Sequence, residues 1–450
     1  MANKDVPKDM YFLVKIMFFI LGLGTLLPWN FFITALTYFQ SRLVTSNATM
    51  GDNPDRNSTH GEDKFNFNNW MTLLAQLPLL LFTLLNSFLY QWISDRTRIV
   101  GSMVGILALF VFTATLVKVD MSPQTFFSIT MVTIWFINSF GAVLQGSLFG
   151  LLGLLPQSYS SLFLSGQGMA GTFAAVAMLL SLASGADTQT SALGYFITPC
   201  VGTLISILCY LALPHLEFAR YYLDKSSMQI YELETRAELL QPEEKNGVPN
   251  GTPKATLVLD DTKENGPVKG QRKVSVFTVL RKIWLQALCI VLTFTATLSM
   301  FPAITANVRS TTGEQRWNIF FSPVCCFLIF SVLDWLGRST TTYILWPGKD
   351  SKLLLLLLVS LRFVFVPLFM LCNIPDRYYL PVIFKQDIWF IIFMTIFSFS
   401  NGYFVSLTMC LAPKNVLPHE SKTTGVLMTF FLALGLSCGA GFSFLFKALL

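Results

Sequence analysis

Charged side chains are scarce in this sequence of 450 residues. Asp, Glu, Lys and Arg make up 12% of the chain, against about 25% in a typical soluble domain. Hydrophobic residues make up 53%, and 42 residues are phenylalanine. A single soluble core stops growing at roughly 250–300 residues, so this much apolar surface excludes an ordinary soluble enzyme. The same hydrophobicity excludes a disordered chain.

Several catalytic and binding patterns are missing. The three histidines are His60, His215 and His419, and all lie outside the apolar runs. The sequence has no glycine-rich phosphate loop and no paired acidic motif that would hold a magnesium-bound diphosphate. Its basic residues form no tract with interleaved aromatics, which argues against nucleic acid as a partner. We therefore expect no enzymatic activity, no metal and no other cofactor.

Long apolar runs are what the sequence has in abundance. A helix needs about 20 apolar residues to cross the hydrocarbon core of a bilayer. We find eleven such runs, near 11–38, 70–90, 98–117, 125–150, 162–183, 191–213, 283–306, 319–343, 353–372, 388–411 and 423–448. Backbone polar groups in lipid must bond internally, so these runs should be helices. The prediction is an all-α integral membrane protein with eleven transmembrane helices.

Two hydrophilic segments interrupt these runs. Segment 41–69 contains two acceptor sequences for N-glycosylation, at Asn47 and Asn57, so we expect an extracellular loop. Eleven crossings then place the N-terminus in the cytoplasm and the C-terminus outside. Segment 215–282 is rich in Glu, Lys, Gly and Pro, and we expect a cytoplasmic, largely disordered loop. A regulatory segment phosphorylated at Ser226 or Ser227 is the alternative interpretation.

These divisions predict two bundles joined by the loop 215–282. The N-terminal bundle, 1–214, holds spans one to six, and the C-terminal bundle, 283–450, holds spans seven to eleven. Pro28 and Pro302 lie at similar depths in the first and seventh spans, which suggests matching helix breaks. Repeated halves around a central cavity are common among transporters. We therefore expect two pseudo-symmetric bundles.

Only three charged residues lie well inside a predicted span: Asp334, Arg338 and Arg362. Asp334 and Arg338 are four positions apart and so share a helix face. Intramembrane charges are costly and usually functional. A carboxylate accepts from vicinal hydroxyls and a guanidinium donates to oxygens, so we favour a site for a solute with hydroxyls over a purely structural ion pair. We interpret Arg362 as a structural or snorkelling residue.

Amides and an aromatic residue add to the candidate site. Gln145 in the fourth span is expected to bind the edge of a heterocycle, the alternative being an interhelical hydrogen bond. Trp29 follows Pro28 in the first span and could stack on a flat ring. Gln76 in the second span lies at similar depth. The stretch 165–171 is a small-residue face, which we interpret as packing rather than binding.

Several motifs resemble the equilibrative nucleoside transporters. They are LGLGTLLPWNFF at 21–32, the run 138–156, DWLGRS at 334–339, SNGY at 400–403 and the C-terminal run 430–450. The resemblance covers essentially every span. It implies a major-facilitator-like fold with six plus five helices. It also implies facilitated, ion-independent diffusion of purine and pyrimidine nucleosides such as adenosine and uridine, and of some nucleobases, across the plasma membrane by alternating access. The partners it implies are nucleosides, nucleoside-analogue drugs or inhibitors and membrane lipid, with the protein acting as a monomer.

The resemblance also implies roles for single residues. In this family the central site uses residues that match Leu26, Trp29, Gln76, Leu79, Gln145, Asp334, Arg338 and Leu436 of this sequence. The glutamine meets the base, and the aspartate and arginine meet the ribose. An outer gate matches Ile33 and Pro302. Closure on the cytoplasmic side matches Arg98, near Asn30.

Three positions depart from the family pattern. Lys422 stands where the acidic partner of the closing arginine is usually found, so Glu420 is the candidate replacement. Gly141 stands where the subfamily most similar to this chain is expected to have serine, and the smaller residue could leave room for bulky inhibitors. Ser331 replaces an expected asparagine and could weaken a hydrogen bond beside Asp334.

Two other functions remain open at this point. A proton-coupled nucleoside transporter would need a titrating carboxylate within the membrane, and Asp334 is the only candidate. A non-transporting membrane scaffold would act through the loop 215–282.

Overall fold

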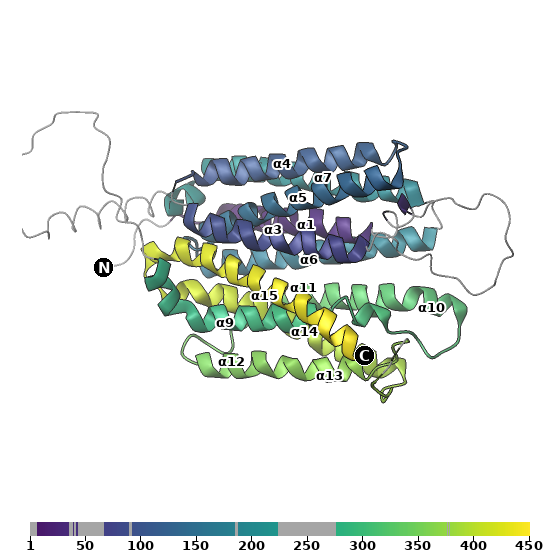
Figure 1. Cartoon of the computed structure of the whole chain (residues 1–450). Helices are drawn as coiled ribbons and strands as arrows, with labels where there is room; N and C mark the ends of the chain where they lie inside the picture. Colours follow the sequence, from purple (N-terminus) through teal and green to yellow (C-terminus); the bar gives the residue numbers. More distant parts are fainter. Residues whose placement is uncertain are drawn as a thin grey trace, which may run out of the picture.

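The structure is a computed structural model that describes residues 7–35, 39, 42–43, 67–89, 92–184, 188–223, 276–375, 377 and 379–450. These residues are almost entirely helical (Figure 1). Asn47 and Asn57, Ser226 and Ser227, and most of the two predicted hydrophilic loops lie outside the described residues.

The first half of the chain supplies long, mostly uninterrupted helices. They are α1 (Leu13–Thr34), α3 (Phe67–Leu89), α4 (Asp95–Leu116), α5 (Pro123–Leu152), α6 (Gln157–Ser184) and α7 (Thr188–Ala212). Serine caps begin two of them. Ser94 accepts from the Thr97 N–H at 3.3 Å, and Ser122 accepts from the Thr125 N–H at 3.4 Å. Such caps satisfy backbone donors that have no partner within the helix.

Helices in the second half are more often broken. They are α9 (Val276–Met300), α10 (Gln315–Phe321), α11 (Ile329–Thr340), α12 (Lys352–Leu361), α13 (Phe365–Met370), α14 (Asp387–Leu411) and α15 (Ser421–Leu449). A π-helical segment, Ser322–Leu328, joins α10 to α11, and a 3₁₀ turn, Arg362–Val364, joins α12 to α13. A proline lacks the N–H of a regular helix, so Pro323 accounts for the first irregularity.

Ten helices within the described ranges are long and apolar enough to cross a membrane. α3 occupies the place of the predicted second span, but its apolar part is only the shorter stretch Leu73–Phe88. It includes Gln76, which faces a cavity, and Asn86, which binds an arginine. The all-helical membrane class is confirmed, whereas the count of eleven spans is not.

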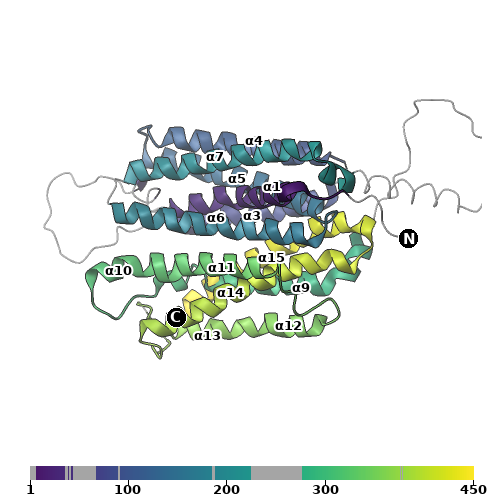
Figure 2. The same ribbon diagram turned by 180° about the vertical axis from the view of Figure 1, so that it is seen from behind.

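The helices pack in two groups, as Figures 1 and 2 show from opposite sides. In the N-terminal group, α1 packs on α6 and α7, and α4 packs on α5 and α7. In the C-terminal group, α9 packs on α15 and α11 packs on α14. Between the groups, α6 contacts α11, and α15 contacts α3 and α5.

Glycine permits the close approach of α1 to α6. A Cβ atom at Gly22 would lie 2.0 Å from the Phe163 carbonyl oxygen, and one at Gly166 would lie 2.0 Å from the Phe19 carbonyl oxygen. Any side chain at either position would push the two helices apart, as in other tightly packed membrane helices.

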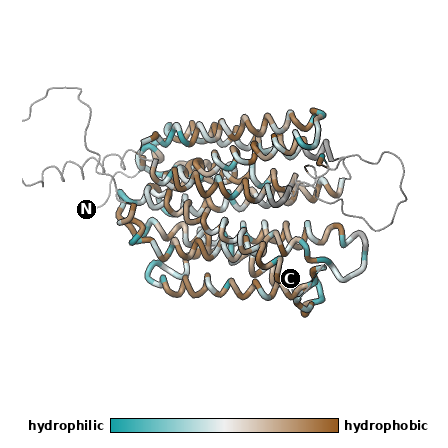
Figure 3. Tube along the Cα trace, in the orientation of Figure 1, coloured by the Kyte–Doolittle hydropathy of each residue, from teal (hydrophilic) through white to brown (hydrophobic). Residues whose placement is uncertain are grey.

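Apolar residues dominate the length of the helices, and hydrophilic residues gather at their ends (Figure 3). Large apolar side chains such as Phe173, Leu208 and Leu357 are at least half exposed. A water-soluble protein rarely presents such surfaces continuously, whereas a bilayer accommodates them. The chain is a multi-pass membrane protein.

Candidate functional site

A cavity of about 280 Å³ lies between the two helix groups. Its walls come from α1, α3, α4, α5 and α6 on one side and from α9, α11, α14 and α15 on the other. Every residue that the family resemblance assigns to substrate binding lines it: Leu26, Trp29, Gln76, Leu79, Gln145, Asp334, Arg338 and Leu436. Asn30, Ile33, Gly141, Pro302 and Ser331 line it as well. Arg98 lies outside this set.

Asp334 and Arg338 form an ion pair in the cavity wall. Nε of Arg338 donates to Oδ2 of Asp334 at 2.7 Å, as their spacing along one helix predicts. The other carboxylate oxygen, Oδ1, accepts from Nδ2 of Asn401 at 2.7 Å. α14 comes this close because Gly402 has no side chain, and a Cβ there would lie 1.9 Å from the Asp334 carbonyl oxygen. Two helices therefore fix both oxygens of the carboxylate.

Asn401 was identified from the sequence only as part of the SNGY motif, without a role. Its amide is buried, lines the cavity and holds Asp334. A polar amide within an apolar span was the available signal, because buried polar groups nearly always have a partner. The identity of that partner depends on which helix lies opposite.

Gln167 is a second residue whose role the sequence analysis missed. Its Oε1 accepts from Nη1 of Arg338 at 3.4 Å, and its Nε2 donates to Oγ1 of Thr25 at 3.2 Å. The stretch 165–171, interpreted from the sequence as a packing face, also borders the cavity, because Gln167, Gly168 and Gly171 line it. Gly166 in the same stretch does pack against α1.

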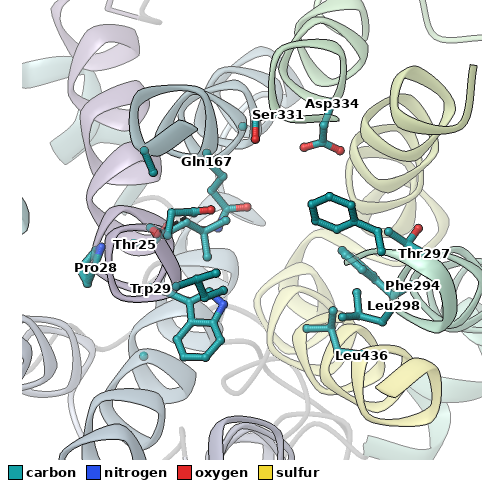
Figure 4. A pocket seen from close by; sticks show the side chains of 18 of the residues that line it. Thr25, Pro28, Trp29, Gln167, Phe294, Thr297, Leu298, Ser331, Asp334 and Leu436 are labelled. Carbon is teal, nitrogen blue, oxygen red and sulfur yellow. Dashed lines mark hydrogen bonds between the residues drawn. The ribbon is translucent and has the colours of Figure 1, made fainter. Parts of the chain in front are cut away.

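The rest of the cavity is more apolar. Figure 4 shows Asp334, Ser331 and Gln167 gathered at one part of the cavity, with Trp29 and Leu436 away from them. The Trp29 ring is parallel to that of Phe32, one turn along α1, with centroids 6.5 Å apart. The cavity therefore has the flat aromatic ring of Trp29 in one part and polar side chains in another.

Gln76 presents an unused acceptor. Its Oε1 is buried and accepts no hydrogen bond from any described residue. A buried acceptor without a partner costs roughly 1–3 kcal/mol. The side chain lines the cavity, so a donor on a bound solute could satisfy it.

The interpretation of Arg362 as a snorkelling residue is wrong. The side chain is 2% exposed and points into the C-terminal group. Its guanidinium donates to Ser400, Thr297 and two backbone carbonyls. The short α12 and the 3₁₀ turn beginning at Arg362 place it well inside the protein.

The sequence of this chain is similar to those of known membrane transporters. The nucleoside transporter family profile matches residues 131–448. The chain is 65% identical over 460 residues to equilibrative nucleoside transporter 2 of Mus musculus, with 100% of both sequences covered. The chain belongs to the equilibrative nucleoside transporter family. This membership makes it a membrane transporter rather than an enzyme, as the sequence motifs predicted.

Other relatives agree. Equilibrative nucleoside transporter 2 of Homo sapiens is 65% identical over 458 residues, and equilibrative nucleoside transporter 1 of Rattus norvegicus is 49% identical over 466 residues, with 100% of both chains covered in each case. Among solved structures, the major facilitator superfamily proton:xylose symporter XylE aligns with a TM-score of 0.57 at 11% identity, covering 97% of this chain and 87% of its own. The human organic anion transporter MFSD10 aligns with a TM-score of 0.53 at 13% identity, covering 97% of this chain and 94% of its own. This likeness confirms a major-facilitator-like fold.

Gly141, where the family resemblance implies serine, lines the cavity. A Cβ atom placed there would meet no other atom within 4 Å. Open space therefore adjoins this residue, which lines the cavity, and a Cβ fits there without a clash.

Lys422, where the family resemblance implies an acidic residue, lies at the end of the molecule where α4 and α15 begin. Arg98 donates to Asn86 at 2.8 Å and to Ser147 at 3.0 Å, and it pairs with Asp95. Asp95 also pairs with Lys422 of α15, with Nζ 2.5 Å from Oδ2. The carboxylate that links the two groups here thus comes from α4, and the lysine comes from α15.

One expectation about this end is therefore wrong. Glu420 does not pair with Arg98, because both its oxygens accept from Lys282 at 2.7 Å. Arg98 is bound among Asn86, Ser147 and Asp95, and Asn30 lines the cavity and donates to the Leu26 carbonyl at 2.8 Å. The order of the helices decides which carboxylate Arg98 meets, and the sequence does not display that order.

Proposed function

We propose that this transporter carries purine and pyrimidine nucleosides across the plasma membrane by facilitated, ion-independent diffusion. The observation that carries the proposal is the two-part lining of the central cavity. A nucleoside has the same two parts: a ribose with vicinal hydroxyls and a flat heterocycle with polar edges. The names of the full-length relatives support the same substrate class.

Each part of the cavity has a role in this proposal. Asp334 accepts from ribose hydroxyls and Arg338 donates to ribose oxygens, as their chemistry allows. Gln145 and Gln76 bind the polar edge of the base. Apolar side chains cover the faces of the base: Leu26, Trp29, Leu79 and Leu436. Nucleobases lack the ribose contacts, and we expect the protein to carry some of them with lower affinity.

Transport proceeds by alternating access, with the two helix groups rocking about the cavity. Ile33 and Pro302 form the outer gate. At the inner end, the Asp95–Lys422 ion pair and the bound Arg98 hold the groups together. This assignment places the N-terminus in the cytoplasm and the C-terminus outside, with Asn47 and Asn57 as glycosylation sites on the outer loop.

The hydrogen bonds around Asp334 argue against the alternative of proton coupling. Its two oxygens already accept from Arg338 and Asn401. A transported proton would have to displace one of these charge-assisted bonds, which are stronger than neutral ones. The geometry therefore favours a permanently paired carboxylate.

Uridine uptake into proteoliposomes tests the proposal. We expect uptake to reach equal inner and outer concentrations, with or without inward sodium and proton gradients, and to be absent from protein-free liposomes. Accumulation above equality with a proton gradient would instead assign coupling to Asp334. Absence of nucleoside uptake under all conditions would refute the proposed substrate.

A further inference from the structure

Asp334 is connected to a buried arginine that does not itself line the cavity. Arg362 on the 3₁₀ turn between α12 and α13 lies behind the cavity wall formed by α9 and α14. Its Nη2 donates to Thr297 Oγ1 at 3.0 Å, and Thr297 Oγ1 donates to Asn401 Oδ1 at 2.6 Å. Nδ2 of Asn401 then donates to Asp334 at 2.7 Å.

The direction of each bond in this series depends on the one before it. Thr297 has one hydroxyl proton and two acceptors in reach, Asn401 Oδ1 at 2.6 Å and the Thr293 carbonyl at 2.8 Å. Arg362 Nη1 donates to that same carbonyl at 2.8 Å. Because the carbonyl already accepts from Arg362 and Oδ1 of Asn401 lies closer, this arrangement favours donation of the threonine proton to Asn401.

The amide of Asn401 has two possible orientations, which its partners distinguish. With Thr297 donating to Oδ1, the amide must turn Nδ2 toward Asp334. If Thr297 donated to the helix instead, the carboxylate of Asp334 alone would hold Nδ2 of the amide in place. The amide would then be less firmly oriented, and each turn of its oxygen toward Asp334 would repel the carboxylate from its present position.

Arg362 is itself held firmly. Nε donates to Ser400 Oγ at 3.1 Å, Nη2 also donates to the Phe397 carbonyl at 3.2 Å, and the guanidinium carbon lies 4.9 Å from the Phe397 ring centroid. A planar guanidinium serves all these acceptors together, and an ammonium group does not.

We propose that Arg362 is a positioning residue, which acts through Thr297 and Asn401 to orient the Asp334 carboxylate toward the hydroxyls of the substrate. The inference rests on the proposed contact between Asp334 and ribose. It assigns to Arg362 an influence on substrate preference although its side chain does not reach the cavity.

The test compares uptake of uridine with that of 2′,3′-dideoxyuridine, which lacks both ribose hydroxyls available to Asp334. For Arg362→Lys we expect the KM of uridine to rise about three- to tenfold, the range for losing one well-oriented hydrogen bond. The KM of dideoxyuridine should stay near that of the wild type. Arg377→Lys is the matched control, because Arg377 also bonds several carbonyls in the C-terminal group but not the wall of the cavity.

If Arg362 had a purely structural role, Arg362→Lys would reduce the uptake of both nucleosides equally, through lower surface abundance or a lower maximal rate. That result would overturn the inference. If the wild type takes up both nucleosides equally well, the proposed contact between Asp334 and ribose is refuted, and the inference about Arg362 is refuted with it. Absence of uptake by the wild type would refute the proposed function itself, which is a separate result.

A second set of variants decides the matter if Arg362→Lys does not reach the membrane. Thr297→Val removes the hydroxyl and should lower the preference for uridine, whereas Thr297→Ser keeps the hydroxyl and should preserve it. Thr429→Val is the control, because within the described part of the chain the Thr429 hydroxyl bonds only inside α15, to the Gly425 carbonyl. An unchanged preference in Thr297→Val would overturn the inference.

Where both single variants are active, Arg362→Lys should change the nucleoside preference no further in the Thr297→Val background. Fully additive effects would show that Arg362 acts independently of Thr297.

Discussion

Arg338 and Gln167 face each other across the boundary between the two helix groups. Nη1 of Arg338 on α11 lies 3.4 Å from Oε1 of Gln167 on α6, and the two residues are 171 positions apart in the sequence. Arg338 also belongs to the proposed ribose site. One guanidinium thus contacts the carboxylate of its own helix group and an amide of the other group.

Gln167→Glu tests this contact as a link between the groups. A carboxylate there would pair with Arg338, and bonds to charged groups contribute about 1.5–3 kcal/mol. If the groups separate at this point during transport, we expect the maximal rate of uridine exchange to fall about tenfold. Gln167→Ala, which removes the link, should be no slower than the wild type in that step. An equally fast Gln167→Glu variant would show that the contact persists through the cycle.

Arg338→Lys tests the proposed ribose site. Lysine keeps the charge but cannot donate to Asp334 and a ribose oxygen with the fixed geometry of a guanidinium. We expect initial uridine uptake, normalised to protein at the surface, to fall at least about tenfold, the effect of roughly 1.4 kcal/mol. Arg96→Lys, on the exposed surface of α4, is the control and should transport normally. Full uptake by Arg338→Lys would rule out the assigned contact.

Gln145→Ala tests the base site. Purines and pyrimidines present different donors and acceptors at their edges, so removal of the amide should affect them unequally. We expect the ratio of adenosine to uridine uptake to change severalfold, since one hydrogen bond contributes about 0.5–1.5 kcal/mol. Gln124→Ala at the exposed start of the same helix is the control. Equal effects on both nucleosides would assign Gln145 to helix packing.

The ion pair of Asp95 and Lys422 should hold the inner ends of the groups together. Its side chains are 23% and 27% exposed, so screening by salt limits their interaction. From the single variants Asp95→Ala and Lys422→Ala and the double variant, we expect a coupling of about 1 kcal/mol or less in thermal unfolding, decreasing with salt. Strictly additive effects at low salt would show that the pair contributes nothing.

Gly141→Ser tests whether open space beside this residue admits bulky inhibitors. The site accepts a Cβ without contact, so we expect normal surface abundance and normal uridine uptake. Inhibition by a nucleoside analogue with a large apolar substituent should weaken severalfold, measured as the concentration that halves uridine uptake. Unchanged inhibition would place the substituent elsewhere in the cavity.

Hydropathy and residue spacing alone predict that this chain crosses a membrane many times and that Asp334 and Arg338 share a helix face. Both conclusions depend on local properties, namely hydropathy along a run and the periodicity of one helix. The family motifs added the residues that line the cavity, and the structure brings all eight of the predicted binding residues to its walls.

The polar groups that meet across helices could be identified only from the folded arrangement of the chain. Gln167 meets Arg338, Asn401 meets Asp334 67 positions away, and Asp95 meets Lys422 327 positions away. Such pairings depend on the order, rotation and depth of neighbouring helices, which packing of the whole chain sets. Arg362 shows the same limit, because whether a charged side chain turns toward lipid headgroups or inward depends on the acceptors that other helices bring to it.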